Sequence, residues 1–301
     1  MRKVPSIASI LGACVSLAAL AAMPAAAKEL KVISEKTASG FGHNESVVYD
    51  SVRNVFYTGD FGGELKPAEK DGKGKINQVS FDGKLVETIF PPAGTTMNKP
   101  KGLWIRRDKL FVADIDAVWE IDLKTKEGKK LDLPINYAND VAVIKNVLYI
   151  SDNRNDAIVR VEPADFMNAK SPPAISFAMK GKGIFPNGIY PGRGKILVMG
   201  GFKSKEEPLG LYSMSPGKDP KPLGDKIGMV DGLYYISNGD ILATDWVTGS
   251  LFQWNKQMGI KKLAGDFKGP ADFCVVPTKQ GLLVVVPDLV KGELRFVQLG
   301  R

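Results

Sequence analysis

Short apolar stretches alternate with turns rich in Gly, Pro and Asn along the chain, and the same order of elements returns several times. In one copy, the segment FPNGI at 185–189 leads through a glycine-rich turn into the apolar segment 195–201. Short apolar runs bounded by turn residues are typical of β-strands. Each copy therefore predicts a strand, a turn and a second strand.

Six copies of this unit follow one another, about 38 to 56 residues apart. A third strand is expected in every copy and a fourth in all but the last. The alternation of apolar and polar residues at 29–34 supplies one extra strand near the N-terminus. One residue at the start of each first strand occupies an equivalent position, and we call these residues the anchors. The anchors are Glu45, Lys101, Asn139, Asn187, Asp231 and Ala271.

Four-stranded units at this spacing are typical of propeller blades. We therefore expect an all-β fold, a six-bladed β-propeller whose last blade is completed by the N-terminal strand. Closing the ring in this way removes the free edges of the sheets. A parallel β-helix would need much shorter repeats, and a β-sandwich would not produce six equivalent anchors.

Residues 1–27 have the pattern of a secretory signal peptide. Two basic residues are followed by an apolar stretch from Ile7 to Met23 and by small residues up to Ala27. Cleavage after about Ala27 would leave a propeller domain at 28–301, exported to the periplasm or secreted. The alternative is a lipoprotein modified at Cys14, which would require a very short apolar segment before the cysteine.

The chain without residues 1–27 has 274 residues, with 39 basic and 33 acidic side chains. The positive charge is spread over many Lys-rich turns, which predicts a solvated surface. No motif with interleaved basic and aromatic residues indicates a nucleic-acid partner, and we expect no membrane contact in the mature form. Cys274 would be the one cysteine left, so an intramolecular disulfide is excluded. The oligomeric state does not follow from the sequence.

The first strand of every propeller blade lines the central channel, so the six anchors should form a ring. Carboxylates and carboxamides in that ring offer only oxygen donors, which suit Ca²⁺ or Mg²⁺ better than Zn²⁺. The alternative is that Asn-Gly and Asp-Gly pairs are turn signals, which fits Asn238 well. It fits Asn187 and Asp231 less well, because both precede an apolar strand at the same repeat position as Glu45.

The order of four short motifs along residues 29–301 resembles the SMP-30/gluconolactonase/LRE-like family. The motifs are Glu45 in the first unit, Asn139 followed by Asp, Asn187 between Pro and Gly, and Asp231 between Val and Gly. The resemblance implies that Glu45, Asn187 and Asp231 bind one divalent cation, with Ca²⁺ expected first and Mg²⁺, Mn²⁺ or Zn²⁺ as alternatives. It also implies that Asp231 is the catalytic base and that Asn139 contacts a small-molecule substrate.

This chain departs from the family pattern in the first blade. The family usually has Glu-Gly-Pro followed by an aromatic residue, whereas Ser46, Val47, Val48 and Tyr49 follow Glu45 here. The ligand is kept and its neighbours differ, so the departure concerns the choice of substrate more than metal binding.

Lys101 is a second candidate substrate-binding residue, because an ammonium in the ring could hold a substrate carboxylate or an oxyanion. A surface lysine ahead of a strand is an equally good interpretation. His43, the one histidine, lies two residues before Glu45 and is either a proton shuttle or an ordinary loop residue. A single histidine and the lack of a Gly-x-Ser-x-Gly motif argue against a serine hydrolase.

Two repeated residue types are expected to be structural. Aspartates end the second strands of five units and should cap turns, and the tryptophans should pack between blades. The aspartates are Asp60, Asp114, Asp152, Asp245 and Asp288, and the tryptophans are Trp104, Trp119, Trp246 and Trp254.

These features leave two functional classes open. The first is an exported divalent-metal-dependent hydrolase of a sugar lactone or similar cyclic ester, gluconolactonase-like. The second is a non-catalytic propeller that binds a small ligand or a protein at the channel mouth. A channel left open above the metal would favour the first, and one closed by the insertions at 61–71 and 203–208 the second.

Overall fold

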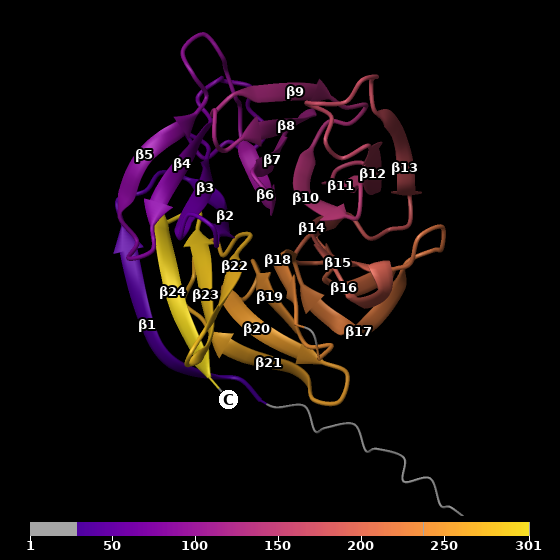
Figure 1. Ribbon diagram of the computed structural model, residues 1–301. Helices are drawn as coiled ribbons and strands as arrows, with labels where there is room; N and C mark the ends of the chain where they lie inside the picture. The colour runs from indigo at the N-terminus through magenta and orange to yellow at the C-terminus, as the bar shows by residue number, and fades with distance from the viewer. Residues whose placement is uncertain (1–28, 237, 301) are drawn as a thin grey trace, which may run out of the picture.

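Six four-stranded antiparallel sheets are arranged in a ring around a central channel in the computed structural model (Figure 1). The structure describes residues 29–236 and 238–300. The expected all-β six-bladed propeller is therefore confirmed, whereas the expected signal peptide at 1–27 lies outside the described residues. No helix in the described residues is long and apolar enough to cross a membrane.

Each of the first three blades is built from four consecutive strands. Blade one comprises β2 (Asn44–Asp50), β3 (Val55–Asp60), β4 (Lys75–Ser80) and β5 (Leu85–Phe90). Blade two comprises β6 (Pro100–Arg106), β7 (Lys109–Asp114), β8 (Ala117–Asp122) and β9 (Gly128–Asp132). Blade three comprises β10 (Ala138–Ile144), β11 (Val147–Asp152), β12 (Ala157–Glu162) and β13 (Ala174–Lys180).

The remaining blades follow the same plan until the chain closes the ring. Blade four comprises β14 (Pro186–Pro191), β15 (Leu197–Gly201), β16 (Leu209–Met214) and β17 (Lys221–Gly228), with a short 3₁₀ turn, η1 (Arg193–Lys195), after β14. Blade five comprises β18 (Val230–Tyr235), β19 (Ile241–Asp245), β20 (Ser250–Asn255) and β21 (Gly259–Ala264). Blade six comprises β22 (Cys274–Thr278), β23 (Gly281–Asp288), β24 (Glu293–Gly300) and, from the N-terminus, β1 (Lys31–Ser39).

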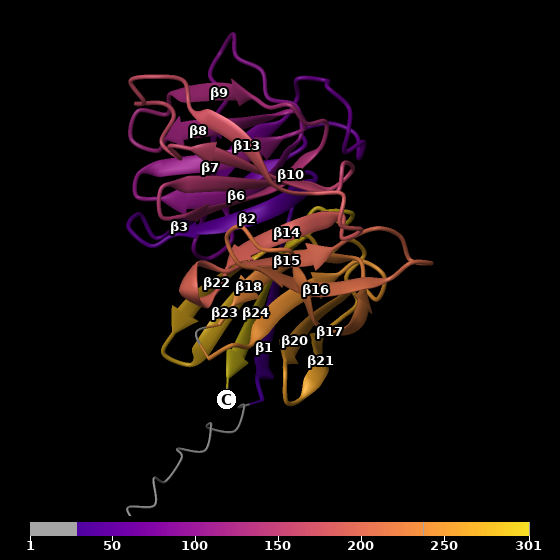
Figure 2. The same ribbon diagram turned by 90° about the vertical axis from the view of Figure 1, so that its right-hand side faces the viewer.

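The N-terminal strand completes blade six as the sequence predicts. β1 runs antiparallel to β24, from Lys31 opposite Gly300 to Ser39 opposite Glu293, and lies beside it in both views (Figures 1 and 2). The strand is longer than the alternation at 29–34 indicated. Leu30 precedes it, is 3% exposed, and donates its backbone N–H to the side chain of Gln253 in blade five. The closing strand therefore joins two blades.

Six apolar clusters fill the spaces between consecutive blades, and each takes residues from both neighbours. The cluster between blades one and six includes Val47, Phe56 and Phe296. Cys274 belongs to the same cluster, buried as expected for an inert thiol. Since every blade packs on two neighbours, the ring positions all six inner strands at once.

Deletion of residues 28–36 should strongly lower the thermal midpoint, because it removes Leu30 and most of β1. Leu30→Ala alone should cost about 2 to 4 kcal/mol of unfolding free energy, typical of a buried leucine. Ile33→Ala is the matched control on the same strand, since Ile33 is 55% exposed, and should change it by less than about 0.5 kcal/mol. Thermal and denaturant unfolding measure both. An unchanged midpoint for the deletion would contradict this role of β1.

Candidate functional site

Five of the six anchors lie in irregularities of the innermost strand of their blade. The pairing of β2 with β3 shifts register between Asn44 and Ser46, so Glu45 has no direct partner on β3. The same shift encloses Lys101, Asn139, Asn187 and Asp231 in the next four blades. A bulge leaves a residue unpaired and redirects its side chain. The bulges therefore turn these five anchors away from their own sheets.

Hydroxyl groups on second strands link neighbouring inner strands. Ser151 on β11 accepts from Asp140 N at 2.9 Å and donates to the carbonyl of Asn187 at 2.6 Å. Thr244 on β19 accepts from Gly232 N at 2.8 Å and donates to the carbonyl of Ala271 at 3.1 Å. Each hydroxyl thus fixes the anchor of the next blade through its backbone.

Close packing of the strands explains the glycine after Asn187. A Cβ atom at Gly188 would lie 1.8 Å from the carbonyl oxygen of Asp231. Only glycine lets β14 and β18 approach this closely. The Asn-Gly pair thus lies in a contact between two inner strands and is not a turn.

The repeated aspartates hold the segments just before the anchors. Asp114 accepts hydrogen bonds from Asn98 N at 3.0 Å and Lys99 N at 2.8 Å, three and two residues before Lys101. Asp245 accepts from Met229 N at 2.9 Å, two residues before Asp231. The carboxylate of Asp288 likewise accepts hydrogen bonds from Lys268 N and Gly269 N, three and two residues before Ala271. Their structural role is confirmed, and it places the anchors as well as the turns.

Three anchor side chains each carry a buried oxygen with no hydrogen-bond partner. The atoms are Oε2 of Glu45, Oδ1 of Asn187 and Oδ1 of Asp231, and the three residues are 3 to 5% exposed. A buried acceptor left unsatisfied costs about 1 to 3 kcal/mol. Other unpartnered atoms occur elsewhere in the described chain, but these three belong to the three predicted metal ligands. The oxygens therefore fit a bound cation.

The two carboxylates of the ring interact electrostatically. Burial raises the pKa of Glu45 well above its usual range, the negative charge of Asp231 raises it further, and the ammonium of Lys101 opposes the rise. Burial raises the pKa of Asp231 to about 7, opposed by a hydrogen bond from Trp246. Two carboxyls with raised pKa values favour a positive partner that would stabilise both as carboxylates.

The three predicted ligands carry less negative charge than the ligands of many metal sites. No group of three or more His, Cys, Asp or Glu side chains in residues 29–236 and 238–300 is arranged to hold a metal. The ring has two carboxylates and the carboxamide of Asn187 instead. All-oxygen sites with carboxamide ligands suit Ca²⁺, which tolerates flexible geometry.

Lys101 is buried in the ring and is not a surface lysine. It is 0% exposed, donates to the carbonyl of Lys99 at 3.2 Å, and lies 4.7 Å from the ring centre of Tyr137. Arg154 stacks 4.1 Å from the centre of the same ring. Burial lowers the pKa of Lys101 to about 8, while Glu45 opposes the shift. The structure therefore supports the interpretation that Lys101 lies in the ring of anchors and excludes a surface lysine.

Tyr137 and Arg154 are site residues that the sequence did not reveal. Tyr137 lies beside Lys101, and burial raises its pKa, which the charges of Glu45 and Asp231 raise further and Arg154 opposes. Tyr137 lies just before β10 and Arg154 follows β11, so neither occupies a repeated position. Only the polar character of these loops could have suggested them. Asn139 itself is 5% exposed at the equivalent position of β10.

Trp246 was expected to be a packing residue, and that interpretation is incomplete. Its indole Nε1 donates to Oδ2 of Asp231, so one oxygen of this carboxylate is fixed and Oδ1 is free. Trp246 also packs against a small apolar cluster of Phe61, Ala271 and Leu289. The tryptophan therefore orients an anchor and covers it.

The anchor end of the channel is partly covered by Phe61. This side chain is 0% exposed and lies 5.4 Å, ring centre to Nζ, from Lys101. The second insertion, 203–208, is mostly exposed, and Lys203 pairs there with Glu207. His43 donates Nδ1–H to the carbonyl of Leu289 at 2.9 Å, which anchors the loop before Glu45. Phe61, the first residue of the insertion at 61–71, thus covers the anchors together with Trp246.

Comparisons with known proteins identify the fold. Neither a protein-family model nor a curated protein sequence matches this chain. A gluconolactonase from Xanthomonas campestris has a similar structure, with a TM-score of 0.65 and 12% identity over 89% of this chain and 91% of that one. A virginiamycin B lyase from Staphylococcus aureus reaches a TM-score of 0.59 and 13% identity over 91% of this chain and 100% of the other. Identities this low show a shared fold alone.

A divalent cation should stabilise the folded protein, by about 2.7 kcal/mol at a hundredfold excess over its Kd. Without metal, the raised pKa values of Glu45 and Asp231 mean that stability from these groups is present at low pH and lost as pH rises, through about 7 for Asp231. Metal needs both carboxylates ionised, so the rise in Tm on adding Ca²⁺ should be larger at about pH 8 than at about pH 5.5.

The matched pair of variants for this measurement is Glu45→Gln and Glu120→Gln. Glu120 is also fully buried, and burial raises its pKa to about 7, but it lies on β8 outside the ring. Calorimetric titration should show weakened metal binding for the first variant and wild-type binding for the second. Equal affinity in wild type and Glu45→Gln would refute the assignment.

Proposed function

We propose that this chain is an exported, divalent-metal-dependent hydrolase of a sugar lactone or a similar small cyclic ester. The observation that carries the proposal is the set of three unpartnered buried oxygens on Glu45, Asn187 and Asp231. The family resemblance of the motifs and the fold shared with a gluconolactonase support it. Export rests on the signal-like segment at 1–27.

Glu45, Asn187 and Asp231 would hold the cation. When bound, a divalent cation would polarise the lactone carbonyl and stabilise the negative charge that develops on its oxygen. The protonated ammonium of Lys101 provides a second positive group, which can bind that oxygen or a carboxylate of the substrate. Asn139 supplies a neutral carboxamide for the substrate hydroxyls.

Asp231 would act on the water molecule that attacks the carbonyl carbon. Its carboxylate takes a proton from the water as the new C–O bond forms, and the proton is then passed to the ring oxygen as the ester C–O bond breaks. The hydrogen bond from Trp246 holds this carboxylate in one orientation.

The alternative is a non-catalytic propeller that keeps the ring as a structural metal site. The cover formed by Phe61 favours it, because the anchors are at most 5% exposed. A substrate would reach them only if Phe61 or Trp246 moved. Hydrolysis by the wild-type protein decides between the two functions.

Asp231→Asn should separate metal binding from proton transfer. The variant keeps an oxygen donor of the same shape but removes the charge and the base, so metal binding should weaken while the fold survives. At saturating metal, lactone hydrolysis should stay about 10² to 10⁴ below wild type, as expected for loss of a general base. A panel of lactones with Ca²⁺, Mg²⁺, Mn²⁺ and Zn²⁺ provides the measurement, with Glu120→Gln as the control.

Two results would overturn parts of this proposal. If saturating metal restored wild-type turnover to Asp231→Asn, Asp231 would be a ligand and another group would be the base. If the wild-type protein hydrolysed no lactone with any of the four metals, the binding-propeller alternative would replace the hydrolase.

A further inference from the structure

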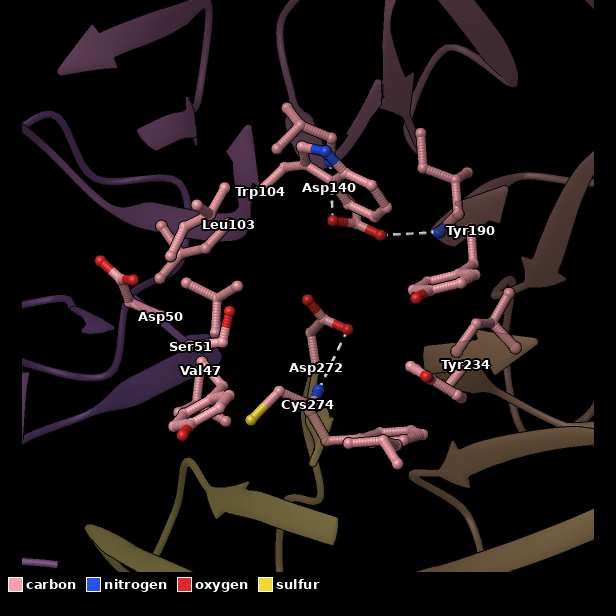
Figure 3. Close-up of a pocket in the computed structure, with 18 of the residues that line it drawn as sticks. Val47, Asp50, Ser51, Leu103, Trp104, Asp140, Tyr190, Tyr234, Asp272 and Cys274 are labelled. Atoms are coloured by element: carbon pink, nitrogen blue, oxygen red, sulfur yellow. Dashed lines mark hydrogen bonds between the residues drawn. The ribbon is translucent and has the colours of Figure 1, made fainter. Parts of the chain in front are cut away.

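A separate cavity of about 420 Å³ occupies the opposite end of the central channel from the anchors. All six blades line it, each with the residue two positions after its anchor, and every blade except the third also with residues further along the inner strand (Figure 3). None of the anchors lines it. The six residues at the shared position are Val47, Leu103, Val141, Ile189, Leu233 and Phe273.

Two aspartates lie at the inner end of this cavity, one residue after the anchors of blades three and six. Both point into the open space in the view along the channel (Figure 3). Asp140 accepts hydrogen bonds from Val141 N at 2.6 Å and Ile189 N at 2.7 Å. Asp272 accepts one from Phe273 N at 3.0 Å, on Oδ1. None of the described residues donates to Oδ2 of Asp272, which leaves this atom available to a ligand.

Carboxyl groups outnumber basic groups along the channel. Four carboxyl groups lie there, those of Glu45 and Asp231 at the ring and those of Asp140 and Asp272 below it. The basic groups, the ammonium of Lys101 and the guanidinium of Arg154, both lie at the anchor end. Burial raises the pKa of Asp140 to about 8 and that of Asp272 well above its usual range. A cation at the ring would stabilise the ionised forms of Glu45 and Asp231 only. The second pair has no buried cationic partner among the described residues.

Aromatic side chains form one wall of the cavity. The rings of Trp104 and Tyr190 have centres 5.5 Å apart, and those of Tyr190 and Tyr234 are 4.9 Å apart. Trp104, Tyr190 and Tyr234 are only partly buried, so their faces are accessible from the cavity. Aromatic faces attract cations and stack against flat apolar groups.

The rim does not change this balance of charge at the inner end. Asp50 lines the cavity, but its carboxylate is used by an ion pair with Arg53 at 2.8 Å. Arg107 also lines the rim and is exposed to solvent. A guanidinium in water contributes little at the far end of an apolar cavity. The cavity therefore presents an apolar aromatic body with two carboxyl groups at its inner end, which a bound cation would hold in their ionised forms.

We propose that this cavity, which we call the far-end pocket, binds a small organic cation, namely a protonated amine that carries a flat apolar group. The ammonium would donate to Oδ2 of Asp272 and lie between the two aspartates, and the apolar group would pack on Trp104, Tyr190 and Tyr234. A volume of about 420 Å³ lies within the range of small-molecule sites. The inference rests on the cavity and its charge, not on the proposed hydrolysis.

Three probes of the same shape test the charge requirement on the full-length mature protein in Ca²⁺-containing buffer. Phenethylamine is cationic, phenethyl alcohol is neutral and 3-phenylpropanoate is anionic. Titration calorimetry should show the amine binding at least about tenfold more tightly than the alcohol, as expected for a charge-assisted hydrogen bond. The anion should not bind. Equal binding of amine and alcohol, or tighter binding of the anion, would overturn the proposal without any variant.

Variants then locate the site. Asp272→Asn should abolish the preference for the amine, whereas Arg107→Ala, the control at the rim, should leave it unchanged or slightly stronger. Trp104→Leu should weaken the binding of phenethylamine and of phenethyl alcohol to the same extent, because it removes part of the aromatic wall. Retention of the full preference in Asp272→Asn would show that the amine binds elsewhere. None of these readouts depends on lactone hydrolysis, so either proposal can fail alone.

Discussion

Buried charge in the central channel is the constraint on which the structure of this propeller depends. Each blade contributes an inner strand to a narrow axis, and four of the blades place a carboxyl group there. Burying an ionised carboxylate without a partner is costly, so such groups either hold their protons or have a cation nearby. The raised pKa values of Glu45, Asp140, Asp231 and Asp272 are the direct sign of this cost.

The rest of the fold keeps these groups in place despite that cost. Apolar clusters between all six pairs of neighbouring blades fix the inner strands, and the register shifts turn the anchors toward the axis. Asp114 and Asp245 fix the chain just before two anchors, and Ser151 and Thr244 fix the backbone of the next ones. The oxygens of Glu45, Asn187 and Asp231 that lack a hydrogen-bond partner are held in fixed positions by these contacts.

The repeat predicted the architecture because local pattern and global fold agree in this chain. Strand spacing, the missing outer strand of the last blade and the extra strand at the N-terminus all follow from the alternation of apolar and polar residues. The anchors could be predicted for the same reason, since a polar residue before each apolar strand recurs at one position. Asn187 and Asp231 were predicted to be site residues and not turn residues because they occupy this repeated position.

Residues outside the repeat could not be predicted in this way. Tyr137, Arg154 and Phe61 come from connecting loops, whose paths over the channel depend on tertiary packing. The hydrogen bond from Trp246 to Asp231 needs the bulge on β18, and no sequence signal marks the bulge itself. The far-end pocket was missed because its aromatic residues resemble ordinary packing positions of a strand.

The central claim is that Glu45, Asn187 and Asp231 together bind one divalent cation, and anomalous diffraction from crystals grown with Mn²⁺ tests it most directly. The account predicts one strong anomalous peak in the ring, within about 2.0 to 2.6 Å of Oε2 of Glu45, Oδ1 of Asn187 and Oδ1 of Asp231. Crystals of Glu45→Gln should lose most of that peak. A ring without anomalous density, or a peak coordinated by other residues, would contradict the claim.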